Sequence, residues 1–284
     1  MNLSITAFVL SLIMCGQVTA FGFVGHFIIG EATYTFLSPA SQKVIARCGY
    51  LQSFNDSLGK ASVWADKVKH LERFKWTRKL HYFDAINDPP ASCGIIRHHD
   101  PYIVADGQNL LAAIQNVTQR ALLHPCICLT KFDFVMLIHF LQDLHQPLHL
   151  TGKARGGNEK SIELRGKRYN LHGVWDSLLI DLYIRESLPV DKRTMRGAIE
   201  YLTSLPANHT SGGDPTSLIV KWANDVMILN CLLVWKLDYA SEETYIELGK
   251  QAMERLMLLA AIRSARLIDT LMQSVNQDCL TLQS

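Results

Sequence analysis

Three histidines and one aspartate lie in the stretch "HFLQDLHQPLH", residues 139–149, directly after the apolar run "FDFVMLI". His139 and Asp143 are four residues apart, so on a helix they share one face. Their apolar neighbours predict a buried helix, in which a carboxylate is costly unless a histidine or a metal ion compensates its charge. A buried His–Asp pair can also be a purely structural contact, and His145 points away from the shared face. The pair therefore indicates a metal site only together with further ligands.

Residues of the same two types recur along the chain. His172 and Asp176 in "NLHGVWD" are again four residues apart. The complete set of candidates is His26, Asp66, His81, His139, Asp143, His149, His172 and Asp176. Imidazole and carboxylate groups are typical zinc ligands, and one tetrahedral site needs only three or four of them. Eight candidates therefore predict more than one ion, with Asp143 suited to bridge two. Paired metal ions about 3.5–4 Å apart favour hydrolysis of a phosphate ester.

The elements that would position these residues are predicted to be helices. Residues 38–51 begin with Ser38-Pro39, an N-cap followed by proline in the first turn. Residues 106–123 carry apolar side chains at helical spacing. Residues 243–275 show a long, largely amphipathic helical pattern.

Two segments depart from the helical pattern. Residues 160–172, "KSIELRGKRYNLH", alternate around Arg165-Gly166 and predict a small hairpin. Residues 205–217 predict a loop, which lies within one domain because the composition does not change across it. The predicted fold is all-α, a single mainly helical domain with one small β-hairpin.

The composition predicts a folded protein without a general nucleic-acid surface. Of 284 residues, 48% are hydrophobic and 19% charged, which is enough apolar material for a sizeable core. The formal net charge is only +2, so the chain lacks the overall basic character of a duplex-binding protein. If it acts on nucleic acid, it does so through a local site.

The N-terminus is predicted to be a secretion signal. Residues 5–15, "ITAFVLSLIMC", form an apolar core of suitable length, and the following "VTA" supplies small residues at the spacing of a cleavage site. A buried N-terminal helix is the alternative. Cleavage after Ala20 would assign residues 1–20 to a signal peptide and 21–284 to the exported domain. No other apolar run reaches the ~18 residues needed to span a bilayer, and "VMILNCLLVW" is too short.

Export changes the interpretation of the cysteines. Six cysteines remain after the predicted signal: Cys48, Cys93, Cys126, Cys128, Cys231 and Cys279. An even number in an exported chain favours disulfides, although spacing alone does not give their connectivity. Glycosylation sequons begin at Asn55, Asn116 and Asn208, as is common in exported proteins.

Several segments, taken together, resemble the zinc-dependent S1/P1 type nucleases. The matching strings are "GH" at 25–26, "WAD" at 64–66, "LHYFDA" at 80–85, "HFLQDLHQPLH" at 139–149, "GGN" at 156–158 and "NLHGVWD" at 170–176. They run in the family's order over the first two thirds of the chain, and the two longest are highly specific. The resemblance implies a secreted, mostly helical enzyme with three zinc ions.

The resemblance also implies which residues hold each ion. Asp66, His81, His139 and Asp143 would hold the first. Asp143 would bridge to a second, completed by His26 and by the amine and carbonyl of the mature first residue. That residue is tryptophan in the family and Phe21 here, which keeps the backbone ligands and loses the indole. His149, His172 and Asp176 would hold the third. The family disulfide would join Cys93 and Cys231.

Three further positions match family residues that act on the substrate. Asp66 and Asp143 are implied to act in catalysis through the metal pair, and Lys69 to steady the phosphate's developing charge. Tyr82 would stack on a base and Asp84 would bind the base edge. The alternatives are that Lys69 is a solvated lysine on a helix without a role in catalysis and that Tyr82 packs in the core. Stacking on an aromatic ring requires an unstacked base, which favours single strands.

We therefore predict a monomeric, exported zinc endonuclease. It would hydrolyse single-stranded DNA and RNA to 5′-phosphate ends and would also act as a 3′-nucleotidase. One alternative is a zinc-dependent phospholipase C, which shares the fold but typically has glutamate where this chain has Asp176. The other is a catalytically inactive zinc-binding paralogue, against which the complete ligand set argues.

Overall fold

Helices make up most of the part of the chain that the computed structural model describes, residues 21–97, 107–123, 129–206, 213–238 and 241–273. The α-helices are α2 (Gly22–Phe36), α3 (Pro39–Arg47), α4 (Leu58–Ser62), α5 (Trp64–Val68), α7 (Leu110–Leu123), α8 (Lys131–Asp143), α9 (Leu171–Gly173), α10 (Leu179–Leu182), α11 (Met195–Ser204), α12 (Pro215–Met227) and α13 (Glu242–Gln273). Shorter 3-10 or π segments are η2 (Gln52–Phe54), η3 (Glu72–His81), η4 (Pro147–Leu150), η5 (Val174–Leu178), η6 (Tyr183–Ser187), η7 (Val190–Lys192) and η8 (Asn230–Val234). The mainly helical prediction is confirmed.

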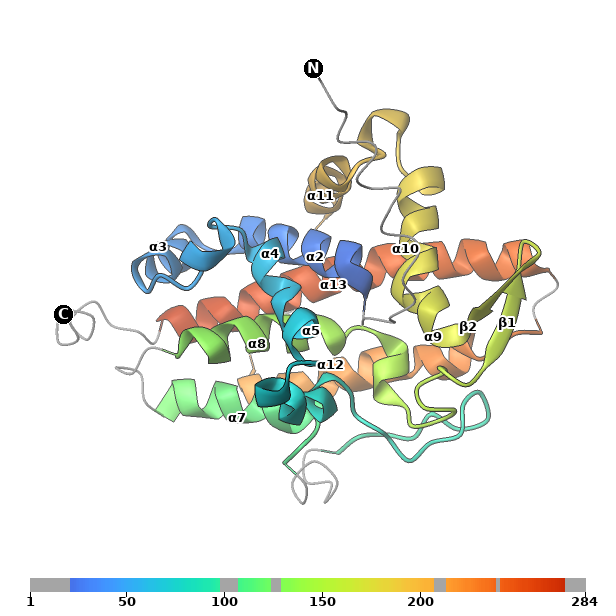
Figure 1. Ribbon diagram of the computed structural model, residues 1–284, viewed down its shortest axis with the longest axis horizontal. Helices are drawn as coiled ribbons and strands as arrows, with labels where there is room; N and C mark the ends of the chain where they lie inside the picture. The colour runs from blue at the N-terminus through green and yellow to red at the C-terminus, as the bar shows by residue number, and fades with distance from the viewer. Residues whose placement is uncertain (1–20, 98–106, 124–128, 207–212, 239–240, 274–284) are drawn as a thin grey trace.

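The long helix α13 organises the fold. Its 32 residues span about 48 Å and cross the length of the molecule in Figure 1. It packs against α2, α3, α8 and α10, and its core-facing side chains include Met253, Met257 and Ile268. This arrangement places α2 and α8, which carry candidate ligands, on neighbouring positions along one supporting helix.

Helix α8 is enclosed by other elements, as its apolar sequence predicts. Thr130 caps its N-terminus by accepting a hydrogen bond from the backbone N–H of Asp133. Every residue from Phe134 to Asp143 is buried. His139 and Asp143 are therefore held inside the protein at the C-terminal end of this helix.

Glycines bring α4 close to α2. A Cβ on Gly30 would lie 2.8 Å from the Cα of Gly59, a separation that no side chain tolerates. Glu31 fixes the same crossing by accepting a hydrogen bond from the backbone N–H of Gly59 at 2.9 Å. The close crossing places α5, which follows α4 directly, beside the start of α2.

The predicted hairpin is confirmed. Strands β1 (Ser161–Leu164) and β2 (Lys167–Asn170) are antiparallel and are joined by Arg165-Gly166. Both turn residues have positive φ, +50° and +70°, which matches the twist of a two-residue hairpin. Arg165 pairs with Glu186 at 2.6 Å and with Glu243 at 2.9 Å, and so ties the hairpin to η6 and α13.

Helix boundaries differ from the predicted ranges by a few residues. Helix α3 ends at Arg47 instead of residue 51, because Cys48 caps it and Gly49 adopts a φ of +66°. Helix α7 begins at Leu110 instead of residue 106, because the Asn109 side chain accepts a hydrogen bond from the backbone of Ala112 and starts the helix there.

The predicted apolar stretch 226–235 belongs to a longer helical run than we expected. Within the described residues, Pro215–Val234 is long and apolar enough to cross a membrane, judged by length and composition alone. Half of its most apolar stretch is nevertheless buried in the fold. The same burial is typical of a core helix, which passes this test equally well.

Several predictions fall outside the described residues. They concern the signal peptide at 1–20, Cys126, Cys128, Cys279 and the sequon at Asn208. Asn55 and Asn116 are described and are exposed. The division into a signal and one exported domain stays a prediction.

The disulfide between Cys93 and Cys231 agrees with the pairing that the family resemblance implies. It closes a span of 138 residues and fastens the segment after Asp84 to η8. We expect the Cys93→Ala/Cys231→Ala variant to lose about 3–5 kcal/mol of unfolding free energy, because a long loop in the unfolded chain is released. Denaturant unfolding measures this. Ser92→Ala/Leu232→Ala, at adjacent positions, is the control, and equal stability of the two variants would contradict the prediction.

Candidate metal centre

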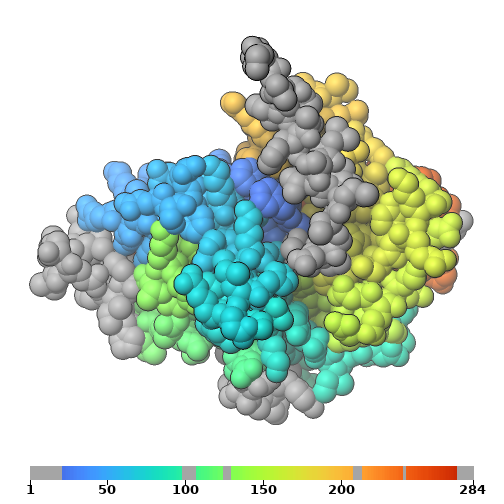
Figure 2. Space-filling view, in the orientation of Figure 1, coloured from blue at the N-terminus to red at the C-terminus, as the bar shows by residue number. Residues whose placement is uncertain are grey.

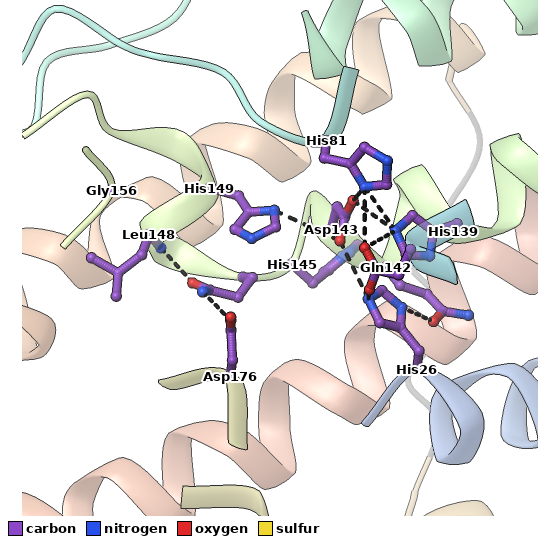
Figure 3. A network of polar contacts seen from close by, with 12 residues as sticks. His26, His81, His139, Gln142, Asp143, His145, Leu148, His149, Gly156 and Asp176 are labelled. Atoms are coloured by element: carbon purple, nitrogen blue, oxygen red, sulfur yellow. Dashed lines mark hydrogen bonds and ion pairs between the residues drawn. The ribbon is translucent and has the colours of Figure 1, made fainter. Parts of the chain in front are cut away.

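Three groups of buried histidine and aspartate side chains lie in the interior, each with ligand atoms within 4.8 Å of one another. The groups are His26, His139 and Asp143; Asp66, His81 and His139; and His149, His172 and Asp176. All eight candidate residues are at most 8% exposed. They come from α2, α5, η3, α8, η4, α9 and η5, so seven separate elements supply one centre. Figure 3 labels six of the eight, His26, His81, His139, Asp143, His149 and Asp176.

Asp143 belongs to the first group and also contacts His81 of the second, while His139 is common to both. One of its carboxylate oxygens is 3.0 Å from His81 Nδ1 and 3.1 Å from His139 Nε2. The other is 3.4 Å from His26 Nε2. Figure 3 shows the three imidazoles turned toward this carboxylate from different sides. A carboxylate with histidines on both oxygens has the geometry of a bridging ligand.

Asp66 approaches the same histidines from α5. Its carboxylate is 3.6 Å from His139 Nε2 and 3.7 Å from His81 Nδ1. The Lys69 ammonium, one helical turn later, is 2.6 Å from the Asp66 carboxylate. Lys69 therefore lies at the edge of the cluster, as the family resemblance implies.

The third group forms beside the first two. His172 Nε2 is 3.0 Å from the Asp176 carboxylate, and His149 Nδ1 is 3.6 Å from Asp143. Asp176 lies in η5, a π-helical turn that follows α9 directly. Such turns occur often at functional sites, because the extra residue redirects a side chain.

Histidine orientation is fixed by the nitrogen that faces away from the centre. His139 Nδ1 is 2.6 Å from the carbonyl oxygen of Ser62, and His172 Nδ1 is 2.6 Å from that of Gly156. His26 Nδ1 is 2.6 Å from Gln142 Oε1. These contacts leave the other nitrogen of each ring facing the cluster, which is the usual arrangement of metal-binding histidines.

Unsatisfied polar atoms test whether the centre fits metal ions. Three buried atoms that face other ligands of the cluster lack a hydrogen-bond partner among the described residues: His26 Nε2, Asp143 Oδ1 and His149 Nδ1. Buried polar atoms are rarely left unpaired, and an ion is one explanation. Donors of two types that both suit zinc make the groups a good fit for it.

Protonation states agree with metal binding. Burial lowers the pKa of His81 and of His149 to about 4, which leaves both imidazoles neutral. Burial opposes ionisation of Asp143, but the charge of His139 and its hydrogen bond to the carboxylate hold the pKa of Asp143 well below the usual range. Burial also opposes charge on His139, yet the negative charges of Asp143 and Asp66 raise its pKa. A proton on His139 thus compensates the charge of these two carboxylates, which a bound metal cation would compensate in its place. Neutral imidazole and ionised carboxylate are the metal-binding forms.

Phe21 lies at the edge of the cluster. Its side chain is fully buried and its ring meets the His26 imidazole edge-on, with 6.1 Å between centroids. Its φ of +43° lies in the left-handed region, which costs a non-glycine residue about 1–3 kcal/mol and is often found at functional sites. Metal binding by its amine and carbonyl stays a prediction.

Tyr82 and Asp84 lie on the exposed side of an extended segment that leaves the cluster after His81. Phe83 between them is buried, and its backbone N–H donates to the His149 carbonyl at 2.7 Å. Partial burial raises the pKa of Tyr82 and of Asp84, and Asp84 adds to the effect on Tyr82. A Cβ on Gly152 would come within 3.4 Å of the Asp84 side chain, so glycine leaves this side open.

Sequence reasoning missed two glutamines that support the centre. Gln142 links His26 to the Ser62 hydroxyl, to which its amide donates at 2.8 Å. Gln146 donates to the Asp176 carboxylate at 2.6 Å. Both are buried within residues 139–149, Gln142 in α8 and Gln146 at the start of η4, and two polar side chains beside the ligands in this apolar stretch were a signal for such a role. His145 is buried but bonds the Leu141 carbonyl, away from the cluster, as predicted.

Comparisons with known proteins agree with this geometry. A model of the S1/P1 nuclease family matches residues 21–273. The chain is 26% identical to nuclease P1 of Penicillium citrinum over 240 residues, which cover 78% of this chain and 85% of that protein. It is 26% identical to nuclease S1 of Aspergillus oryzae over 270 residues, covering 87% and 90%. It is 29% identical to endonuclease 2 of Arabidopsis thaliana over 174 residues, covering 58% of each. The family match contains every residue of the three groups.

Proposed function

The chain belongs to the S1/P1 nuclease family, and on that basis we propose that it is an exported, three-zinc nuclease of single strands. Its membership makes it a hydrolase of phosphodiester bonds. The proposal adds the finer features: single-stranded DNA and RNA as substrates, 5′-phosphate products, and removal of 3′-phosphates from nucleotides. We propose that the enzyme acts as a monomer.

One observation carries the proposal. Three buried carboxylates and five buried histidines converge on one centre and leave several polar atoms without hydrogen bonds. Asp66, His81, His139 and Asp143 would hold one zinc ion, Asp143 and His26 with the Phe21 backbone a second, and His149, His172 and Asp176 a third. Zinc held there would activate a water molecule and neutralise charge on a phosphate.

The chain's own residues would bind and orient the substrate. Lys69, held 2.6 Å from Asp66, places a positive charge at the edge of the centre, where it would stabilise the additional charge on the phosphate. Tyr82 would stack on one base, and the Asp84 carboxylate would accept hydrogen bonds from its edge. Both side chains are partly exposed and follow His81 directly, so a bound base would lie next to the metal ligands.

The position of Tyr82 supports a preference for single strands. A base reaches an aromatic face only when it is unstacked from its neighbours, which is costly in a duplex. The pair Tyr82 and Asp84 also distinguishes a nucleotide from a phospholipid, whose headgroup has no base to stack.

A panel of substrates tests the proposal. Single-stranded DNA, single-stranded RNA, duplex DNA, a 3′-mononucleotide and phosphatidylcholine would each be incubated with and without a zinc chelator. We expect chelator-sensitive turnover of the single strands and the mononucleotide, and slower turnover of the duplex. Turnover of phosphatidylcholine without turnover of nucleic acid would refute the proposal in favour of a phospholipase.

Substitution of Tyr82 by alanine should weaken substrate binding while the metal is retained. Loss of one base–aromatic stack corresponds to a rise in KM of about 5- to 150-fold. Tyr82→Phe, which keeps the ring, is the matched control and should stay within a few-fold of wild type. Steady-state kinetics and zinc analysis measure both effects, and an unchanged KM on every nucleic acid would remove Tyr82 from the binding site.

Export is part of the same proposal. The disulfide between Cys93 and Cys231 is typical of proteins that fold in an oxidising compartment. Removal of residues 1–20 would free the α-amine of Phe21 beside His26, and an amide nitrogen in its place would be no zinc ligand. N-terminal sequencing of the purified protein tests both at once, with Phe21 as the expected first residue.

A further inference from the structure

A strongly basic segment connects two residues of the metal centre. Residues 67–79, "KVKHLERFKWTRK", lie between Asp66 and His81, both of which are buried in the clusters. The Arg78 side chain donates a hydrogen bond to the Lys69 carbonyl at 2.9 Å and so closes the segment into a loop. We call residues 67–79 the basic lip. Both ends of the lip adjoin residues of the metal centre, so a strand bound at the centre has a continuous path onto the lip.

The helical type of η3 sorts the side chains of the lip into rows. In a 3-10 helix, residues three apart lie on the same face. Phe74, Thr77 and Leu80 form the inner row and are buried or half-buried. Arg73, Trp76 and Lys79 form an outer row, and all three are exposed. One row therefore presents a cation, an indole and a second cation in succession.

Trp76 packs against the outside of a cluster of aromatic rings and is not buried within it. Its indole is 59% exposed and lies 5.9 Å from the Phe132 ring, tilted by 37°. Phe132 stacks on Phe74, and Trp64 packs edge-on against both. The cluster of aromatic rings beneath the indole thus supports it, while more than half of its surface faces solvent. This arrangement suits the indole for stacking on a ligand.

The charge of the lip contrasts with that of the remaining chain. Six of its thirteen residues are lysine or arginine and one, Glu72, is acidic, which gives a net charge of +5. The whole chain carries +2, so the residues outside the lip carry −3. Figure 2 shows the segment, in cyan, near the centre of the molecular face in view. A positive patch on an otherwise acidic molecule concentrates its attraction for anions at one place.

We infer that the basic lip is a second binding surface for the single strand, on which nucleotides beyond the cleaved bond place their phosphates against Arg73 and Lys79 and stack a base on Trp76. Cations that alternate with an exposed aromatic ring are the features by which proteins bind single strands without reading sequence. The inference rests on the proposed nuclease function and extends it, because it assigns a preference for strands of several nucleotides over mononucleotides and dinucleotides. Continuity with the metal centre favours a strand over an anionic membrane, because a strand that is cleaved at the centre extends beyond it, whereas a membrane has no chain to continue from the centre onto the lip.

Neutralisation of two cations tests the phosphate contacts. We expect Arg73→Gln/Lys79→Gln to raise KM about tenfold for single-stranded DNA of about 30 nucleotides, and to leave kcat and KM for a dinucleotide unchanged. The slope of log KM against log salt should fall by about 1.4, because each phosphate contact on a single strand contributes about 0.7. Arg196→Gln/Lys221→Gln, which removes two exposed charges elsewhere, is the matched control and should behave as wild type. Lys69 is left intact because it belongs to the catalytic centre.

Substitution of the indole tests the stacking contact separately. Trp76→Ala should raise KM for the same strand about tenfold without changing dinucleotide turnover. Trp76→Phe keeps an aromatic face and should recover most of the binding. Circular dichroism and zinc content, equal to those of wild type, would show that the fold and the centre are retained.

The outcomes separate the lip from the nuclease function. If wild type cleaves both substrates and the variants match it at every salt concentration, the lip is overturned and the proposed function stands. If wild type cleaves neither, the proposed function fails, and binding of a fluorescent oligothymidylate to wild type and variants then decides for or against the lip. Vesicles of phosphatidylcholine and phosphatidylserine are the third arm. Vesicle binding that the double substitution abolishes, with oligonucleotide binding unchanged, would overturn the inference in favour of a membrane surface.

Discussion

Asp143→Asn should abolish activity and lower the zinc content of the purified protein. The Asp143 carboxylate is fully buried and lies within 3.6 Å of His26, His81, His139 and His149. Asparagine keeps the shape but removes the charge and one oxygen, so one ion of the proposed pair would lose its oxygen ligand and the other would keep only a neutral amide oxygen. We expect turnover to fall by about 10³-fold or more, which corresponds to several kcal/mol of lost charge stabilisation. Kinetics and elemental analysis on the same preparation measure both losses.

A matched substitution on the same helix serves as the control. Asp133 lies in the first turn of α8, where it pairs with Arg120 at 2.9 Å, away from the centre. Asp133→Asn should retain zinc and activity, since the same chemical change is made outside the cluster. An Asp143→Asn protein with full zinc stoichiometry and normal turnover would show that Asp143 is not a bridging ligand.

Removal of zinc should destabilise the protein as well as inactivate it. Three buried carboxylates, from Asp66, Asp143 and Asp176, would lose the cations that compensate them. When the free zinc concentration is 1,000 times the Kd, binding stabilises the folded protein by about 4 kcal/mol. For a protein of this size, loss of that stabilisation corresponds to a fall in Tm of about 8–16 °C. Calorimetry before and after dialysis against EDTA measures the shift.

Zinc-saturated EDTA is the control for nonspecific effects of the chelator. It should leave Tm and turnover unchanged, and addition of zinc to the stripped protein should restore both. Asp143→Asn should show a smaller chelator-induced shift than wild type, because it holds less metal at the outset. A wild-type protein whose Tm and activity survive verified removal of zinc would contradict the assignment of the centre.

Local sequence determined the chemistry of the centre. The spacing of four in His139–Asp143 and His172–Asp176 predicts that each pair lies on one side of a helical turn, and the contacts of 3.1 and 3.0 Å agree with it, the second across the junction of α9 and the π-helical η5. The apolar run before His139 likewise determined that α8 is buried. The hairpin turn Arg165-Gly166 was predictable because period-two alternation and turn chemistry are properties of adjacent residues.

Tertiary structure decided how the ligands meet and what surrounds them. His26 and Gln142 are 116 residues apart and touch only because α2 and α8 pack beside α13. Such contacts depend on many weak packing interactions that must together offset the entropy of closing long loops, so no local pattern announces them. The exposure of Trp76 was equally hidden, because "ERFKWTRKLH" as an α-helix would distribute its side chains with a different period. Only the 3-10 geometry of η3 aligns Arg73, Trp76 and Lys79 in one outer row.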